Sequence, residues 1–265
     1  DIRDFFFIPL PSRGLEEKIK QHVIKADELL NKSKSLLQNI NILLTQHIGF
    51  QDFTPSKTSH SSRNLKDYLQ SGRLDGEYWQ PKYDEIEDRI KNYPGGYDTF
   101  DNLIHVSSET VNLDAEKSYM YVELSSVNAG VGLIEEPSEM NGNELPSRAK
   151  MLLKEDDVIL ASVEGSSGKV AIVKDGPHNL VGSSGFFVLR EKHYLPEVML
   201  ALLRVPYINM LVKRQAQGTI LTAVPRGSLA RVILPKLPKD FQEQIALQIK
   251  EAQNLYEMSK KSLEL

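Results

Sequence analysis

The stretch Leu234-Pro235-Lys236-Leu237-Pro238, followed by Phe241-Gln242-Glu243-Gln244-Ile245, has a counterpart 226 residues earlier in the chain. There, Ile8-Pro9-Leu10-Pro11 precedes Leu15-Glu16-Glu17-Lys18-Ile19. In both copies the prolines, which lack an N–H and fix φ, hold the chain extended before a long helical pattern begins. The repeat therefore predicts two equivalent strand-and-helix units, one at each end of the sequence.

Apolar and small residues recur every seven positions along both helical patterns, which is typical of a coiled-coil seam. Burying each Leu, Ile or Val of such a seam contributes roughly 1.5–3 kcal/mol. We therefore expect the helices to pair with each other, antiparallel because a domain separates them, or with helices of another subunit. Two amphipathic helices on an ordinary core are the alternative. The expected interface residues are Ile19, Val23, Ala26, Leu30 and Leu37 in the first helix and Ile245, Ile249, Ala252, Tyr256 and Leu263 in the second.

Between the helices the pattern changes to short β-branched runs cut by turn residues, which indicates strands. A helix from Pro196 to about Gln215, kinked at Pro206, interrupts them. We expect an α+β fold, a mixed or antiparallel sheet with flanking helices plus an antiparallel coiled coil. The predicted divisions are a proline-rich strand and helix over 1–45, a linker over 46–63, a globular domain over 64–233 and a second helix over 234–265.

The charge of the chain is unevenly distributed. The net charge is -4, which by itself disfavours nucleic acid because phosphate neutralisation needs lysine and arginine. However, residues 161–231 hold nine basic and four acidic side chains, and 198–239 hold no carboxylate. Any anion-binding face should therefore come from this stretch. A solvated basic surface would produce the same pattern.

Two loops of this stretch carry residue types suited to DNA. The first, Glu164-Gly165-Ser166-Ser167-Gly168-Lys169, offers backbone N–H groups, hydroxyls and an ammonium; the alternative is a simple hairpin turn. The second is Lys213-Arg214-Gln215-Ala216-Gln217-Gly218-Thr219, which begins at a basic helix end. The alternative for its cations is that they stabilise the helix dipole. Its Gln and Arg side chains suit adenine and guanine, and its Thr suits a thymine methyl. The candidate DNA contacts are Lys169, Ser166, Ser167, Arg148, Lys213, Arg214, Gln215, Gln217 and Thr219.

Searches for a catalytic centre find no motif. The sequence has no cysteine, its six histidines are scattered, and no methyltransferase motif is present. The Glu-x-Lys spacing of nucleases occurs at Glu16-Glu17-Lys18, but these residues lie on the first helix of the predicted coiled coil. We therefore expect no catalytic residue, no bound metal and no cofactor. The absence of a long apolar run and of a signal peptide predicts a cytoplasmic protein that meets no membrane. Because the chain begins at Asp1 rather than at methionine, we expect it to be a piece of a longer subunit.

The order of these segments resembles the specificity subunit of Type I restriction-modification enzymes. Pro235-Lys236-Leu237-Pro238 with Glu243-Gln244-Ile245-Ala246 resembles the conserved regions of that family. Tyr121-Val122-Glu123-Leu124 and Asp156-Asp157-Val158-Ile159-Leu160-Ala161-Ser162 look like its target recognition domain, and Arg73 to Tyr83 looks like the lead-in to that domain. Together these segments cover nearly the whole chain.

The resemblance implies a division of labour. Such a subunit carries two target recognition domains, each reading half of a split site on double-stranded DNA. An antiparallel coiled coil holds them apart and docks adenine-N6 methyltransferase subunits, which a restriction subunit can join. This chain departs from the pattern because it holds one recognition domain. Two alternatives stay open: a half-length module or coiled-coil adaptor that dimerises through its helices without DNA specificity of its own, and a fragment of a DNA methyltransferase or nuclease.

Overall fold

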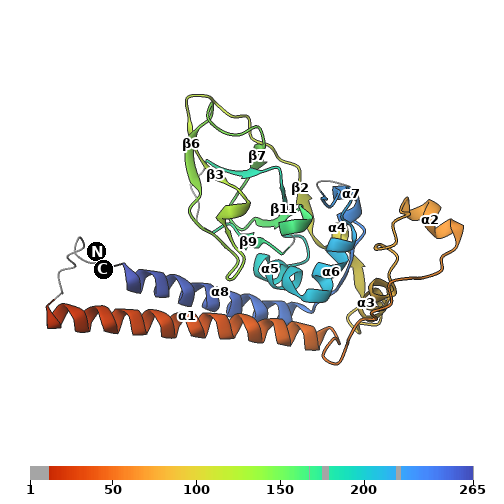
Figure 1. The fold of residues 1–265 in the computed structure, drawn as a ribbon, viewed down its shortest axis with the longest axis horizontal. Coiled ribbons are helices and arrows are strands. Elements are labelled where there is room, and N and C mark those ends of the chain that lie inside the picture. The colour runs from red at the N-terminus through yellow and green to blue at the C-terminus, as the bar shows by residue number, and fades with distance from the viewer. Residues whose placement is uncertain (1–11, 167, 175–178, 219–221, 265) are drawn as a thin grey trace, which may run out of the picture.

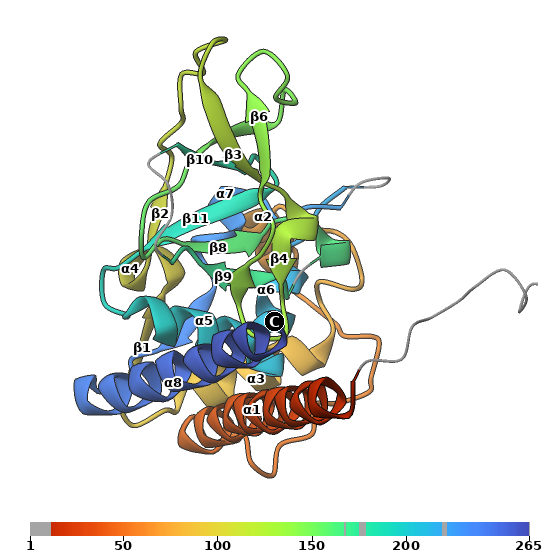
Figure 2. The same cartoon turned by 90° about the vertical axis from the view of Figure 1, so that its left-hand side faces the viewer.

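Two long helices and a domain packed against them make up the molecule. The computed structural model describes residues 12–166, 168–174, 179–218 and 222–264. Helices α1 (Arg13–His47) and α8 (Lys239–Leu263) lie side by side along the bottom of Figure 1. The remaining elements stand over one part of this pair, and the other end of the pair projects away from them (Figures 1 and 2). The proline-rich stretch before α1 lies outside the described residues.

Small residues allow the two helices to approach closely. Ser33 Oγ donates a hydrogen bond to the Ala252 carbonyl at 2.6 Å, and Ser259 Oγ donates one to the Ala26 carbonyl at 2.8 Å. Position 33 therefore meets 252 while position 26 meets 259, so the helices are antiparallel. A larger side chain at either serine would separate the backbones and break these bonds. The predicted antiparallel helix pair is confirmed.

The domain contains three sheets. The largest has six strands in the order β2-β11-β8-β9-β5-β4, the second four in the order β6-β3-β10-β7, and the smallest pairs β1 with β12. The strands are β1 (Tyr97–Thr99), β2 (His105–Ser107), β3 (Ser118–Val122), β4 (Val127–Asn128), β5 (Leu133–Ile134), β6 (Ser138–Asn141), β7 (Ala149–Leu152), β8 (Val158–Ala161), β9 (Val170–Ile172), β10 (Leu180–Ser183), β11 (Phe186–Arg190) and β12 (Ile233–Pro235). Most pairs are antiparallel, but β3 with β10 and β5 with β9 are parallel, so the predicted mixed sheet is confirmed.

Short helices surround these sheets. They are α2 (Leu65–Ser71), α3 (Pro81–Lys91), α4 (Phe100–Leu103), α5 (Pro196–Arg204), α6 (Pro206–Arg214) and α7 (Arg226–Leu229), with 3-10 turns η2 (Leu124–Ser126) and η3 (Glu164–Ser166). The single kinked helix predicted over Pro196–Gln215 is two helices, because Pro206 supplies no N–H and Val205 turns to ψ 125°.

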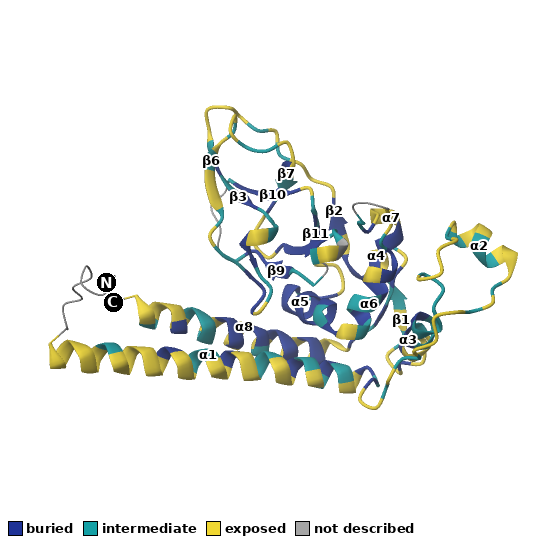
Figure 3. Cartoon of the chain, in the orientation of Figure 1, coloured by how far each residue is buried: buried dark blue, intermediate teal, exposed yellow. Residues whose placement is uncertain are grey.

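Helix α5 joins the domain to the helix pair. Eight of its nine residues are buried, since it contacts α8 and α1 on one side and strands β8 and β9 on the other. One apolar cluster consequently runs from Ile40 and Leu44 on α1, through α5, to Val158 and Leu160 on β8. Figure 3 shows burial concentrated where the domain meets the pair, whereas the projecting end of the pair is largely exposed.

The β4–β5 turn also docks on α5. Gly132 has φ +75°, and a Cβ there would lie 2.6 Å from Leu200 Cδ1, so a side chain would have to displace the helix. Buried Gln253 of α8 holds the same turn by donating to the carbonyls of Val131 and Gly132, each at 3.2 Å. The domain is thus fixed to the pair by directional bonds as well as by apolar packing.

None of the helices within the described ranges has the length and apolar character that crossing a bilayer requires.

Candidate nucleic-acid interface

The two loops singled out by their chemistry lie next to each other. Ala223 forms antiparallel bridges to both Val163 and Gln217. The Ala223 N–H donates to the Gln217 carbonyl at 3.0 Å, and the Val224 N–H donates to the Ser162 carbonyl at 2.8 Å. Segments about 50 residues apart in sequence are therefore joined through residues 222–224, and each restricts where the other can move.

Two more segments are hydrogen-bonded to these loops. The Ser162 N–H and Oγ both donate to the Gly185 carbonyl at 2.9 Å, and the Ser184 N–H donates to the Arg148 carbonyl at 2.7 Å. Hydrogen bonds thus join several loop segments into one continuous surface, here named the loop edge. It consists of residues 146–148, 162–166, 168–169, 183–185, 215–218 and 222–224. Backbone hydrogen bonds hold this surface, which suits a site that must present side chains in fixed positions.

Two candidate cations of the loop edge flank the turn η2. Arg148, 59% exposed, donates to Tyr121 Oη at 3.1 Å and pairs with Glu123 at 2.9 Å. The hydrogen bond to Tyr121, followed by the nearby Glu123 charge, raises the pKa of Arg148, which stays a cation at neutral pH. Lys169 Nζ donates to the Leu124 carbonyl at 2.6 Å. Both side chains therefore contribute positive charge while fixing η2.

Two neighbouring cations at the end of α6, Lys213 and Arg214, differ in burial. Lys213 is exposed, whereas Arg214 is 6% exposed. Arg214 donates to the Tyr78 carbonyl at 2.8 Å and pairs with Glu87 at 2.9 Å and with Asp84 at 3.5 Å. Its guanidinium also lies 4.4 Å from the centre of the Tyr78 ring. The Arg214 side chain is thus engaged within the chain, and Lys213 is the cation that this helix end presents to solvent.

The other predicted contacts differ in the same way. Gln217 is exposed, while Gln215 is buried and its amide donates to the Leu211 carbonyl at 3.4 Å. Ser166 is half-buried within η3. Ser167 and Thr219 lie outside the described residues. DNA contact by all of these residues stays a prediction, and the geometry favours Lys213, Gln217, Lys169 and Arg148 as those with exposed or partly exposed side chains.

Arg73 is a residue that the sequence analysis did not select. Its guanidinium donates to the carbonyls of Gln215 at 3.3 Å and Ala216 at 2.9 Å, and it forms hydrogen bonds with Asp75 at 2.6 and 3.1 Å. The hydrogen bond from Arg73 lowers the pKa of Asp75 and keeps that carboxylate charged. Arg73 thereby ties the 73–83 segment to the loop edge across 142 residues of sequence, and no short-range pattern could indicate this contact.

A cavity of about 700 Å³ lies between the 73–83 segment and the loop edge, next to the Arg73 contacts. Gln217 and Gly218 line it from the loop edge, Lys213 from the end of α6, and Arg73 and Asp75 from the opposite segment. Cations and carboxylates are mixed here, so the cavity has no single sign of charge. Across the described ranges no three His, Asp or Glu side chains come together as a metal site would require.

This chain matches known proteins in its three-dimensional structure. No family model matches the sequence, and no curated protein is similar to it in sequence. The HsdS subunit from Thermoanaerobacter tengcongensis aligns over 59% of this chain and 42% of that chain, with 25% identity and a TM-score of 0.52. This chain has the fold of a Type I specificity subunit. The resemblance found in the sequence is therefore confirmed.

A second specificity-subunit match comes from a structural study of complex assembly and conformational transition in a type I restriction-modification system. It aligns over 59% of this chain and 41% of that chain, with 25% identity and a TM-score of 0.50. The chain thus spans less than half the length of either relative.

The residues predicted for the helix interface occupy three environments. Ala26, Ile245, Ile249 and Ala252 are buried. Ile19, Leu30, Leu37 and Tyr256 are half-buried, and Tyr256 faces the domain, where its hydroxyl donates to Glu135 at 2.8 Å. Val23 and Leu263 are 50% and 55% exposed. Those two lie off the seam between α1 and α8, so contact with another subunit stays a prediction for them.

Proposed function

We propose that this chain is a DNA-reading specificity subunit that recognises one half of a bipartite site and performs no catalysis itself. The observation that carries the proposal is the loop edge. Several chain segments converge there, with Gln217 and Arg148 exposed on the loop edge and Lys213 exposed beside it, on the fold of a Type I specificity subunit. Cations supply affinity by contacting phosphates, while amide side chains discriminate bases.

The two kinds of contact predict different mutational effects. Replacing Lys213 with Ala should weaken binding to every duplex alike and reduce the slope of log K against log salt by about 1. Replacing Gln217 with Ala should leave that slope unchanged and relax one base pair of the site, with a loss of roughly 1–3 kcal/mol of discrimination. Because both side chains are exposed, neither change should unfold the domain.

Selection from a random duplex library defines the preferred site, after which fluorescence anisotropy compares that site with a scrambled one at several salt concentrations. Lys261→Ala and Gln21→Ala serve as matched controls, since both residues are exposed on the helix pair. Equal losses on the selected and scrambled duplexes for Gln217→Ala would remove it from the base-reading residues. A chain that selects no sequence would overturn the proposed function.

We propose further that the helix pair docks adenine-N6 methyltransferase subunits. Its projecting part carries exposed apolar side chains at Leu15, Val23 and Ile24, between 48% and 50% exposed. Co-expression with the cognate methyltransferase should yield a complex that Val23→Glu disrupts and Lys25→Glu, an exposed neighbour on the same helix, leaves intact. Light scattering on the chain alone separates this from self-association: a stable dimer that Val23→Glu dissolves would assign the surface to a second copy instead.

A further inference from the structure

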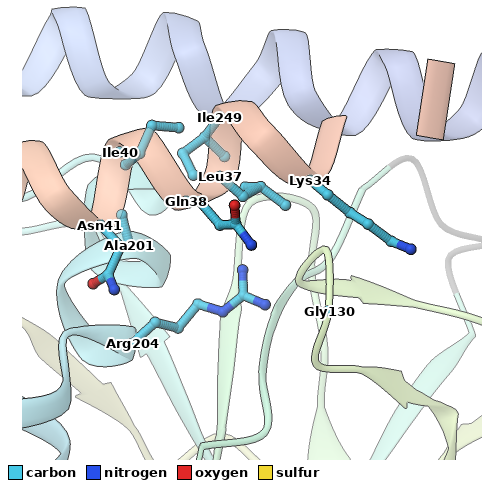
Figure 4. A pocket seen from close by; sticks show the side chains of 9 residues that line it. All are labelled: Lys34, Leu37, Gln38, Ile40, Asn41, Gly130, Ala201, Arg204 and Ile249. Carbon is cyan, nitrogen blue, oxygen red and sulfur yellow. The ribbon is translucent and has the colours of Figure 1, made fainter. Parts of the chain in front are cut away.

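A second cavity lies on the opposite side of α5 from the β8 and β9 strands, where α1, α5 and the turn at Gly130 meet (Figure 4). Its volume is about 300 Å³, near the lower end of the range for small-molecule sites. Leu37 and Ile40 of α1 and Ile249 of α8 supply an apolar lining. It shares no lining residue with the loop edge, so what it binds does not depend on the DNA-reading proposal.

Arg204 lines this cavity, and its guanidinium is not paired with any described residue. Two other shielded guanidiniums each hold a pair of carboxylates: Arg190 binds Asp157 and Glu109, and Arg214 binds Glu87 and Asp84. Arg204 makes no hydrogen bond or ion pair with any residue that the structure describes. Burial alone lowers the pKa of Arg204 to about 10, which leaves it charged at neutral pH. An uncompensated, partly desolvated cation is unfavourable in the empty cavity.

The remaining polar groups reinforce this character. Lys34 of α1 is a second cation at the rim, and none of the described residues that line the cavity is Asp or Glu. Figure 4 shows the Arg204 guanidinium pointing toward α1, where Gln38 lines the same space. A ligand here would therefore meet the Arg204 guanidinium and an apolar surface, with Lys34 at the edge of the cavity.

We propose that this cavity binds a small organic anion, with a carboxylate or phosphate headgroup on Arg204 and a short apolar portion against Leu37 and Ile249. The planar guanidinium can donate two parallel hydrogen bonds to either headgroup, which gives both strength and orientation. The volume admits a headgroup with a chain of a few carbons. A bound anion would connect α1 to α5, and so stiffen the junction between the helix pair and the recognition domain.

Thermal unfolding of the full chain tests the proposal with four probes: sodium pentanoate, pentyl phosphate, 1-pentanol, and sodium chloride at matched ionic strength. Pentanoate or pentyl phosphate should raise the melting temperature by about 5 °C at 100 times its Kd. The larger shift of the two identifies the preferred headgroup. Pentanol and chloride should produce no saturable shift, because neither combines an oxyanion with an apolar chain.

Two variants locate the effect. Arg204→Met removes the headgroup partner, and Ala201→Leu keeps Arg204 but fills space in the cavity. Both should abolish the shift, whereas Lys32→Met, which removes an exposed charge from α1, should preserve it. In the absence of probe Arg204→Met should melt no lower than the parent, because it removes an unpaired charge. In ¹⁵N-arginine-labelled protein, one Nε–Hε resonance should move on addition of the anion and be missing from Arg204→Met.

Three results would overturn the proposal. The first is the absence of a saturable shift with both anions. The second is an equal shift in Arg204→Met, which would indicate a general salt effect. The third is a loss of duplex DNA affinity in Arg204→Met as large as that of Lys213→Ala, which would assign Arg204 to the DNA backbone rather than to a small anion.

Discussion

The seam between α1 and α8 and the loop edge are built in opposite ways. In the seam a seven-residue period places Ala26, Ser33 and Ile40 on one buried line, and antiparallel α8 returns Ile249 and Ala252 to meet them. The loop edge has no period, because its members come from turns in four parts of the chain joined by backbone bonds at Ala223 and Gly185. A regular pattern thus produces a rigid support, while the surface for recognition is assembled from irregular connections.

The largest expected effect breaks the seam. Replacing Ile249, which is 1% exposed, with Ala should lower the free energy of unfolding by roughly 2–5 kcal/mol, because the cavity left behind cannot fully collapse. Leu247 lies two positions away on the same helix and is 70% exposed, so Leu247→Ala should cost less than about 0.5 kcal/mol. Urea unfolding of both variants measures the difference. Equal losses would mean that α8 does not hold this register against α1 and the domain.

An intermediate effect tests whether a basic side chain beside the loop edge supports the fold. Arg214→Met should lower the free energy of unfolding by about 2 kcal/mol, because Glu87 and Asp84 lose their partner and the Tyr78 carbonyl loses its donor. Lys213→Met, its exposed neighbour, should change stability by less than about 0.5 kcal/mol yet weaken DNA binding. If both variants retain full stability, the Arg214 contacts with helix α3 do not contribute to the fold.

The smallest expected effect concerns Glu109, a carboxylate of the domain that pairs with Arg190 and Lys154 and lies outside both regions. Hydrogen bonds from Arg190 and then Lys154 lower the pKa of Glu109 from 4.5 to about 2. A carboxyl whose folded pKa is depressed stabilises the protein above its unfolded pKa, and the contribution is lost as the pH falls from about 4.5 toward 2. Unfolding of Glu109→Gln should therefore depend less on pH over this window than unfolding of the parent. Glu155→Gln, which neutralises a glutamate at an exposed position, is the control variant. A parallel pH profile for Glu109→Gln and the parent would contradict this role.

Local patterns predicted the two long helices, a helix beginning at Pro196 and the presence of strands between the long helices. The heptad repeat placed α1 and α8, and Pro196 placed the start of α5. The position of β10 was not predicted. In β10 the run Leu180-Val181-Gly182-Ser183 is buried throughout and gives no alternation of polar and apolar residues. Side-chain periodicity finds a strand with one wet face, and a strand covered on both faces lacks that signal.

The candidate site was predicted by residue type but not by exposure. Lys213 and Arg214 are indistinguishable in sequence, yet helix α6 directs one to solvent and the other against α3, where Glu87 pairs with it. No short-range pattern singled out Arg73 or Arg204 as individual residues, because Arg73 acts through carbonyls 142 residues away and Arg204 is notable for having no partner among the residues that the structure describes.

The amino-acid sequence by itself determined the paired helices, the α+β class and the basic segment, because periodicity, proline placement and charge are local properties that survive in the unfolded chain. Tertiary structure alone decided which loops meet at one edge, which cations are paired and where Arg204 lies. These depend on which distant segments α5 and the sheets bring within a few ångströms of each other, and an interaction between two residues depends on that distance rather than on their separation along the chain.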